Sequence, residues 1–140
     1  MISVTKIFRF ETAHAIHEYD GLCRNIHGHS YELHVTVTDE FANEHISGNG
    51  FVIDFKILKS LVKTNVLDYF DHKIILSEVY LEEHSNLKGL ENLEIWKAEP
   101  SAENMVLFIH KKLKEILPTN LKIKRIRLYE TADSYAEWEN

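Results

Sequence analysis

The strongest chemical signal in the sequence is a pair of histidines that could bind a metal ion. His27 and His29 flank Gly28 at the entrance to an alternating stretch that predicts a strand. Side chains two residues apart on a strand share a face, so both imidazoles could bind one ion. Spacing alone leaves His14 and His17 as alternatives for a third ligand. Three histidines with an open fourth position are typical of catalytic zinc, although a chance pair among nine histidines is the simpler alternative.

A single cysteine precedes this pair and could act as a base or a nucleophile. Cys23 lies beside Arg24 and four residues before His27. Nearby positive charge favours the thiolate, which is the reactive form. The alternative is a small buried hydrophobic residue, the commoner role of a lone cysteine.

Three carboxylates add further candidates. Asp71 precedes His72 and could orient its imidazole and adjust its basicity, although a helix-end cap is the simpler role. Glu130 ends a predicted strand, where it would be solvated unless a pocket surrounds it. In a pocket it could accept two hydrogen bonds from an amino-pyrimidine edge. Glu103 lies in the first turn of a predicted helix, where its charge favours the helix dipole.

Strands and helices in one domain must position these residues. Four stretches have the pattern of strands: 2–10, 29–38, 121–130 and 134–139. Two have the pattern of helices capped by Asp54 and Ser101: 54–67 and 101–117. Residues 39–50 predict a loop, and residues 71–100 predict a long irregular segment with one helical turn at most.

The order β-β-α-α-β-β predicts an α+β fold. Sequential pairing at both ends of the chain favours an antiparallel four-stranded sheet with both helices on one face. Four strands cannot close a barrel alone, so the open edges favour association with other subunits.

Composition predicts one domain over residues 1–140 and excludes several function classes. The chain is 44% hydrophobic and 27% charged, as globular proteins are. The net charge of −6 argues against binding nucleic acid or an anionic membrane, because both require clustered cations. One cysteine permits no intrachain disulfide and favours the reducing cytoplasm. We recognise neither a membrane span nor a signal peptide.

Five separated motifs resemble those of the 6-pyruvoyltetrahydropterin synthase family. They follow one order along nearly the whole chain: FxxAH ending at His14, CxxxHGH from Cys23, DH followed by Lys73, PSAEN from Pro100, and YET around Glu130. Residues 51–55 (FVIDF) match as well. The three-residue gap between Cys23 and His27 resembles the carboxy-forming members, since the animal biopterin enzymes have a longer gap.

The resemblance implies a T-fold whose subunits form a barrel, in a homohexamer of two stacked trimers. It implies a zinc ion on His14, His27 and His29. Cys23 would be the proton acceptor.

The resemblance further implies that Asp71 and His72 form a proton relay that could reach a neighbouring subunit's site. Glu130 would anchor the pterin and share in the relay. Glu103, in the PSAEN motif, is a second candidate for substrate binding.

The implied reaction converts 7,8-dihydroneopterin triphosphate to 6-carboxy-5,6,7,8-tetrahydropterin, with release of acetaldehyde and triphosphate, in queuosine (7-deazapurine) biosynthesis. One alternative is 6-pyruvoyltetrahydropterin formation, which eliminates triphosphate but keeps the side-chain carbons. Another is a non-catalytic zinc protein whose histidines only stabilise the fold. Residues 77–99 match no family motif and have no assigned role.

Overall fold

Two long antiparallel strands form the centre of the sheet in the computed structural model, which describes residues 1–42 and 44–140. β1 (Ser3–His14) pairs with β2 (His27–Asp39) along its whole length. β5 (Leu121–Thr131) pairs with β2, and β6 (Ser134–Glu139) pairs with β5, both antiparallel. The sequence predicted these four strands, but β1 continues past residue 10 as far as His14. This extension places His14 directly opposite His27.

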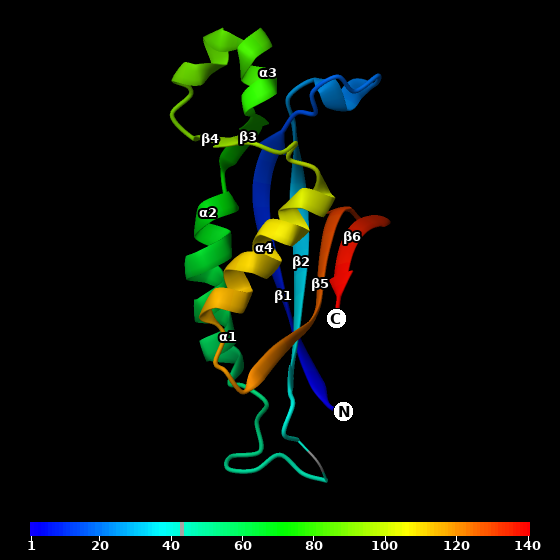
Figure 1. Cartoon of the computed structure of the whole chain (residues 1–140), viewed down its shortest axis with the longest axis vertical. Coiled ribbons are helices and arrows are strands. Elements are labelled where there is room, and N and C mark those ends of the chain that lie inside the picture. The colour runs from blue at the N-terminus through cyan, green and yellow to red at the C-terminus, as the bar shows by residue number, and fades with distance from the viewer. Residues whose placement is uncertain (43) are drawn as a thin grey trace.

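Two short strands correct the prediction of a four-stranded antiparallel sheet. β3 (Lys73–Ser77) pairs in parallel with β1, and β4 (Leu93–Trp96) pairs in parallel with β3. The sheet is therefore mixed and six-stranded, in the order β4-β3-β1-β2-β5-β6 (Figure 1). Consecutive residues at the end of β3 are all buried, so this strand shows no alternation in the sequence. The prediction of an irregular segment over 71–100 was wrong for this reason.

Helices cover one face of the sheet, as the α+β prediction requires (Figure 1). The first helical stretch contains α1 (Phe55–Val62), a π-helical turn (Lys63–Leu67) and α2 (Asp68–Phe70). The second is α4 (Ala102–Ile116). Their predicted caps are confirmed, because side chains of Asp54 and Ser101 accept backbone hydrogen bonds at the two N-termini. No helix in residues 1–42 and 44–140 is long and apolar enough to cross a membrane.

The main core lies between this face and the helices. Alternate residues of β2 are fully buried there: Tyr31, Leu33, Val35 and Val37. The predicted alternation is therefore confirmed, and α4 packs Met105 and Ile109 against the same cluster.

A second, smaller cluster lies at the end of the sheet that carries α3 (Glu78–Glu83) and a 3₁₀ turn (Ser85–Gly89). Its buried residues are Ala15, Leu76, Tyr80 and Leu81. The loop that follows β1 lies at this same end (Figure 1).

Candidate active site

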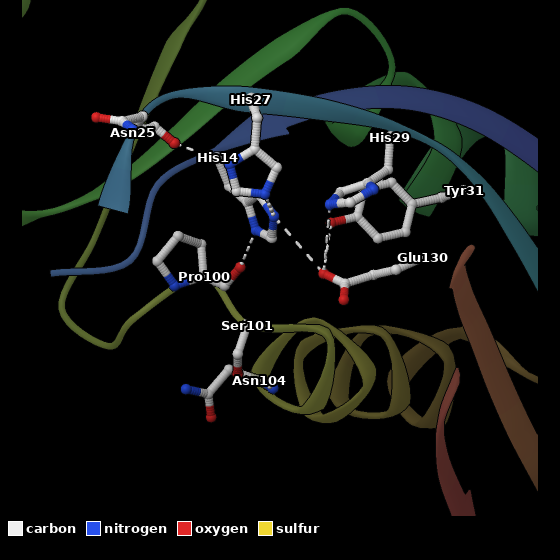
Figure 2. A network of polar contacts seen from close by, with 9 residues as sticks. All are labelled: His14, Asn25, His27, His29, Tyr31, Pro100, Ser101, Asn104 and Glu130. Carbon is white, nitrogen blue, oxygen red and sulfur yellow. Dashed lines mark hydrogen bonds and ion pairs between the residues drawn. The ribbon is translucent and has the colours of Figure 1, made fainter. Parts of the chain in front are cut away.

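Three histidines meet where β1 ends and β2 begins (Figure 2). The potential ligand atoms of His14, His27 and His29 all lie within 4.8 Å of one another. His27 is the register partner of His14, and His29 follows on the same face of β2. Of the two alternatives that spacing left open, the structure brings His14 to the pair. His17 lies beyond the end of β1 and pairs with carboxylates of Glu18 and Glu83 instead.

Hydrogen bonds from the Nδ1 atoms fix the tautomers of His14 and His27. Nδ1 of His14 donates to the Pro100 carbonyl at 2.6 Å, and Nδ1 of His27 donates to the Asn25 carbonyl at 2.8 Å. In the neutral rings the two Nε2 atoms therefore carry lone pairs, and they lie 3.1 Å apart. Facing lone pairs at this distance repel unless a cation lies between them. The arrangement fits a metal ion, and the carbonyls orient its ligands.

Burial favours the neutral form of His14 and His29. Desolvation lowers the pKa of His14, and the Pro100 carbonyl and the Glu130 carboxylate oppose this only in part. Burial also lowers the pKa of His29. Neutral imidazoles are the form that binds metal, and a set of three suits zinc with an open fourth position.

Glu130 extends from β5 to the edge of this histidine cluster (Figure 2). Its Oε1 lies 3.6 Å from Nε2 of His14 and 3.9 Å from Nε2 of His29. The side chain is 29% exposed, so it lines the site without being freely solvated. A carboxylate in this position could bind two N–H groups of a substrate.

Tyr31 contributes a group that the sequence analysis did not single out. It lies two residues after His29 on the same face of β2 and donates its hydroxyl to Oε1 of Glu130 at 3.3 Å. Burial, followed by the charges of Glu130 and Cys23, raises the pKa of Tyr31 far above its ordinary value. The phenol therefore stays a hydrogen-bond donor. Its position in the HxHxY pattern was the available signal.

Cys23 lies on an exposed 3₁₀ turn (Leu22–Arg24) near this site. It is close enough to Tyr31 to influence the pKa of the phenol after the larger effects of burial and Glu130. The thiol does not belong to the metal-binding group found in the described residues. Cys23 is thus placed outside the histidine cluster.

Asp71 and His72 form the predicted pair but lie elsewhere. Their side chains are 3.0 Å apart, and the Glu11 N–H donates to Asp71 at 2.9 Å. This backbone hydrogen bond, with help from His72, lowers the pKa of Asp71. His72 borders an open cavity of about 380 Å³ with Ala13 and Ser30. Ala13 and Ser30 alternate with His14 and His29 along their strands, but His29 itself also lines this cavity. The pair therefore lies near the cluster's strands without belonging to the metal-binding group of the described residues.

Glu103 is exposed on the first turn of α4, as its dipole role requires. No hydrogen bond in the described part of the chain joins it to the histidines. Its neighbours in the PSAEN motif do reach the site: the Pro100 carbonyl binds His14, and Ser101 caps α4 beneath it (Figure 2).

A family model described as 6-pyruvoyl tetrahydropterin synthase matches residues 3–140. A 6-carboxy-5,6,7,8-tetrahydropterin synthase from Haemophilus influenzae is 34% identical over 143 residues, with 99% of each chain covered. A protein of the same name from Rickettsia conorii is 28% identical and covers 98% of this chain and 99% of its own.

Solved structures share the fold. An uncharacterized protein from Wolinella succinogenes superposes with a TM-score of 0.77 at 18% identity, covering 99% of this chain and 98% of its own. A 6-pyruvoyl tetrahydropterin synthase from Caenorhabditis elegans gives a TM-score of 0.72 at 23% identity, with coverages of 99% and 95%.

Proposed function

This chain belongs to the 6-pyruvoyl tetrahydropterin synthase family, and from that premise we propose that it is a zinc-dependent 6-carboxy-5,6,7,8-tetrahydropterin synthase. It would convert 7,8-dihydroneopterin triphosphate to 6-carboxytetrahydropterin, releasing acetaldehyde and triphosphate, in queuosine biosynthesis. The observation that supports this most is the cluster of His14, His27 and His29 with Glu130 at its edge. Full-length similarity to relatives of that name favours the carboxy-forming reaction.

Each group near the cluster has a defined task in this reaction. The zinc ion would supply Lewis-acid stabilisation of negative charge that develops on side-chain oxygens of the substrate. Glu130 would accept hydrogen bonds from amino and ring N–H groups of the pterin, while the Tyr31 hydroxyl holds one carboxylate oxygen in place. The Sγ thiolate of Cys23 would accept a proton from the substrate side chain, because it precedes His27 by four residues and does not belong to the histidine group.

The Asp71–His72 pair would return a proton from a second copy of the chain. Within one chain the pair is not part of the histidine group, and the His72 side chain is largely exposed, which supports a role at a neighbouring subunit's site. A homohexamer of two stacked trimeric barrels would bring such groups together, and the outer edge of β6 is unpaired and available for it. Light scattering at micromolar concentration should give about six subunits, and a monomer mass would contradict the assembly.

Product analysis tests the reaction directly. We expect mass spectrometry after incubation with 7,8-dihydroneopterin triphosphate to find 6-carboxytetrahydropterin and acetaldehyde. A product that keeps all side-chain carbons would instead show the 6-pyruvoyl reaction. No product from the zinc-loaded protein would favour a purely structural metal site.

Glu130→Ala tests substrate binding, because it leaves pterin donors unpaired in the site. We expect KM to rise by at least about tenfold. Glu115→Ala, an exposed change on α4, should leave KM unchanged. Glu103 stays a candidate for substrate binding in the assembled oligomer, and a higher KM for Glu103→Ala would support that role.

A further inference from the structure

The loop that carries Cys23 has little hydrophobic anchoring of its own. None of the residues in its 3₁₀ turn is buried, and Cys23 itself is exposed. One backbone bond closes the loop, from the Ile16 N–H to the Cys23 carbonyl at 2.9 Å. A reactive group on such a segment keeps its position only if neighbouring elements hold it.

Helix α3 provides such a neighbour. Tyr80 is 5% exposed and packs in the smaller core with Ala15, Leu76 and Leu81. Its hydroxyl reaches out of this core and donates to the Arg24 carbonyl at 3.1 Å, one residue after Cys23. Burial raises the pKa of Tyr80, so the phenol remains a donor. A buried ring on a helix is thus tied directly to the exposed turn.

A histidine on the same segment clamps this tyrosine. The ring of His84 stacks on the Tyr80 ring at 4.2 Å with an interplanar angle of 12°. Its Nδ1 also donates to the Tyr80 carbonyl at 2.9 Å. The loop has a further support where the His17 N–H donates to Glu99 at 2.9 Å. Four residues from 77–99, a stretch that matches no family motif, therefore contact the Cys23 loop or its anchor: Tyr80, Glu83, His84 and Glu99.

We propose that Tyr80 is a positioning residue that holds the Cys23 thiolate in place through the Arg24 carbonyl, with His84 as its clamp. This assigns a role to the segment 77–99 and rests on the proposed function of Cys23 as proton acceptor. Small displacements of a reacting group slow proton transfer without changing how the pterin is bound. The expected effect is therefore on kcat, whereas KM depends on Glu130 and the metal.

Tyr80→Phe is the sharpest test, because it removes one hydroxyl and keeps the buried ring. We expect kcat to fall about tenfold with KM changed by less than about twofold. The amide hydrogen of Ile16 should exchange about tenfold faster, since its acceptor belongs to the released loop. Exchange at Val35 in the main core and zinc content should match the native protein. Tyr135→Phe, on the exposed strand β6, is the matched control and should change none of these quantities.

His84→Leu loosens the ring without removing the hydroxyl and should give smaller changes in the same direction. Unchanged Ile16 exchange in Tyr80→Phe overturns the inference, and so does faster exchange with a native kcat. A lower kcat without faster exchange also overturns it. If the native protein forms no product, the proposed function fails, and Ile16 exchange alone decides whether Tyr80 fixes the loop.

Discussion

The metal-binding end of the sheet and the segments with the proton-transfer candidates are held by different kinds of structure. His14, His27 and His29 extend from the two longest strands, whose inward faces continue into the fully buried core. Cys23 lies on a turn with no buried residue. Strand pairing therefore fixes the metal ligands, whereas hydrogen bonds from neighbouring segments fix the thiol.

The same contrast separates the Asp71–His72 pair from the cluster. The pair follows α2, and His72 has a positive φ of 60° just before β3 begins. Its side chain is 79% exposed in the single chain. In the proposed mechanism, one subunit would therefore build the metal site alone, while proton transfer would need contacts from a second copy of the chain.

His27→Ala should have the largest effect. It acts on the rigid region, by which we mean the paired strands β1 and β2 with His14, His27 and His29. Removing one of three ligands should lower zinc affinity by more than about 100-fold and abolish turnover. Metal analysis and product analysis on the same samples measure both. His45→Ala, an exposed change in the loop after β2, should keep zinc and activity. Stoichiometric zinc in His27→Ala would show that the cluster is not the metal site.

Cys23→Ala should leave the rigid region intact and remove only chemistry. We expect stoichiometric zinc and an unchanged oligomer, with turnover lowered by about 100-fold or more. Loss of zinc would make the thiolate a ligand and would remove the distinction between the two regions. Full turnover with full zinc would make Cys23 a bystander.

A mixing experiment sharpens the comparison, because it asks whether one site draws on two chains. Cys23→Ala and His72→Ala should each be nearly inactive. If the two groups serve one site from different subunits, random mixed oligomers should recover activity in about a quarter of their sites. The mixture is refolded together and assayed against each parent. No recovery would place both groups within one chain's site.

The sequence predicted the rigid region well because its signals are local. Alternation in β2 predicted which side chains are buried, and cap residues predicted where α1 and α4 begin. The pair at His27 and His29 followed from strand periodicity alone. Only the choice of His14 needed the β1–β2 register or the family resemblance, because the predicted strand ended before it.

The segments that carry the proton-transfer candidates, Cys23 and the Asp71–His72 pair, depend on contacts that no local sequence pattern shows. β3 and β4 are short, and burial at the end of β3 hides its periodicity, so the segment 71–100 gave no strand signal. The position of His72 depends on the hydrogen bond from its backbone N–H to the Glu11 carbonyl on β1, a contact between distant parts of the sequence. Tyr31 lies on the buried face of β2, as the strand alternation predicts. Only the three-dimensional position of Glu130 shows that the Tyr31 hydroxyl forms a hydrogen bond.

Acidification should gradually lower both the stability of the rigid region and its affinity for zinc. Burial lowers the pKa values of His14 and His29 below 6.5, the ordinary value that the unfolded chain keeps. The unfolded chain then binds more protons, so the metal-free protein should lose stability as the pH falls below 6.5. Zinc affinity should stay nearly constant above pH 6.5 and fall at lower pH, since protons compete for the ligands. Calorimetry and metal titration across this range measure the two effects.

Tyr31→Phe should give the smallest effect and tests whether the two regions meet at Glu130. The phenylalanine keeps the ring that stacks on Phe10 at 5.3 Å, so folding and zinc content should be unchanged. Glu130 loses one hydrogen bond, but its partial exposure lets water replace the hydroxyl. We expect a cost of about 1 kcal/mol, which is a rise in KM of about fivefold with a nearly constant kcat. A lower kcat at constant KM would instead assign the hydroxyl to the thiol, whose charge also acts on the Tyr31 pKa. Loss of zinc would assign it to the metal site, because the ring also contacts His29 edge to face.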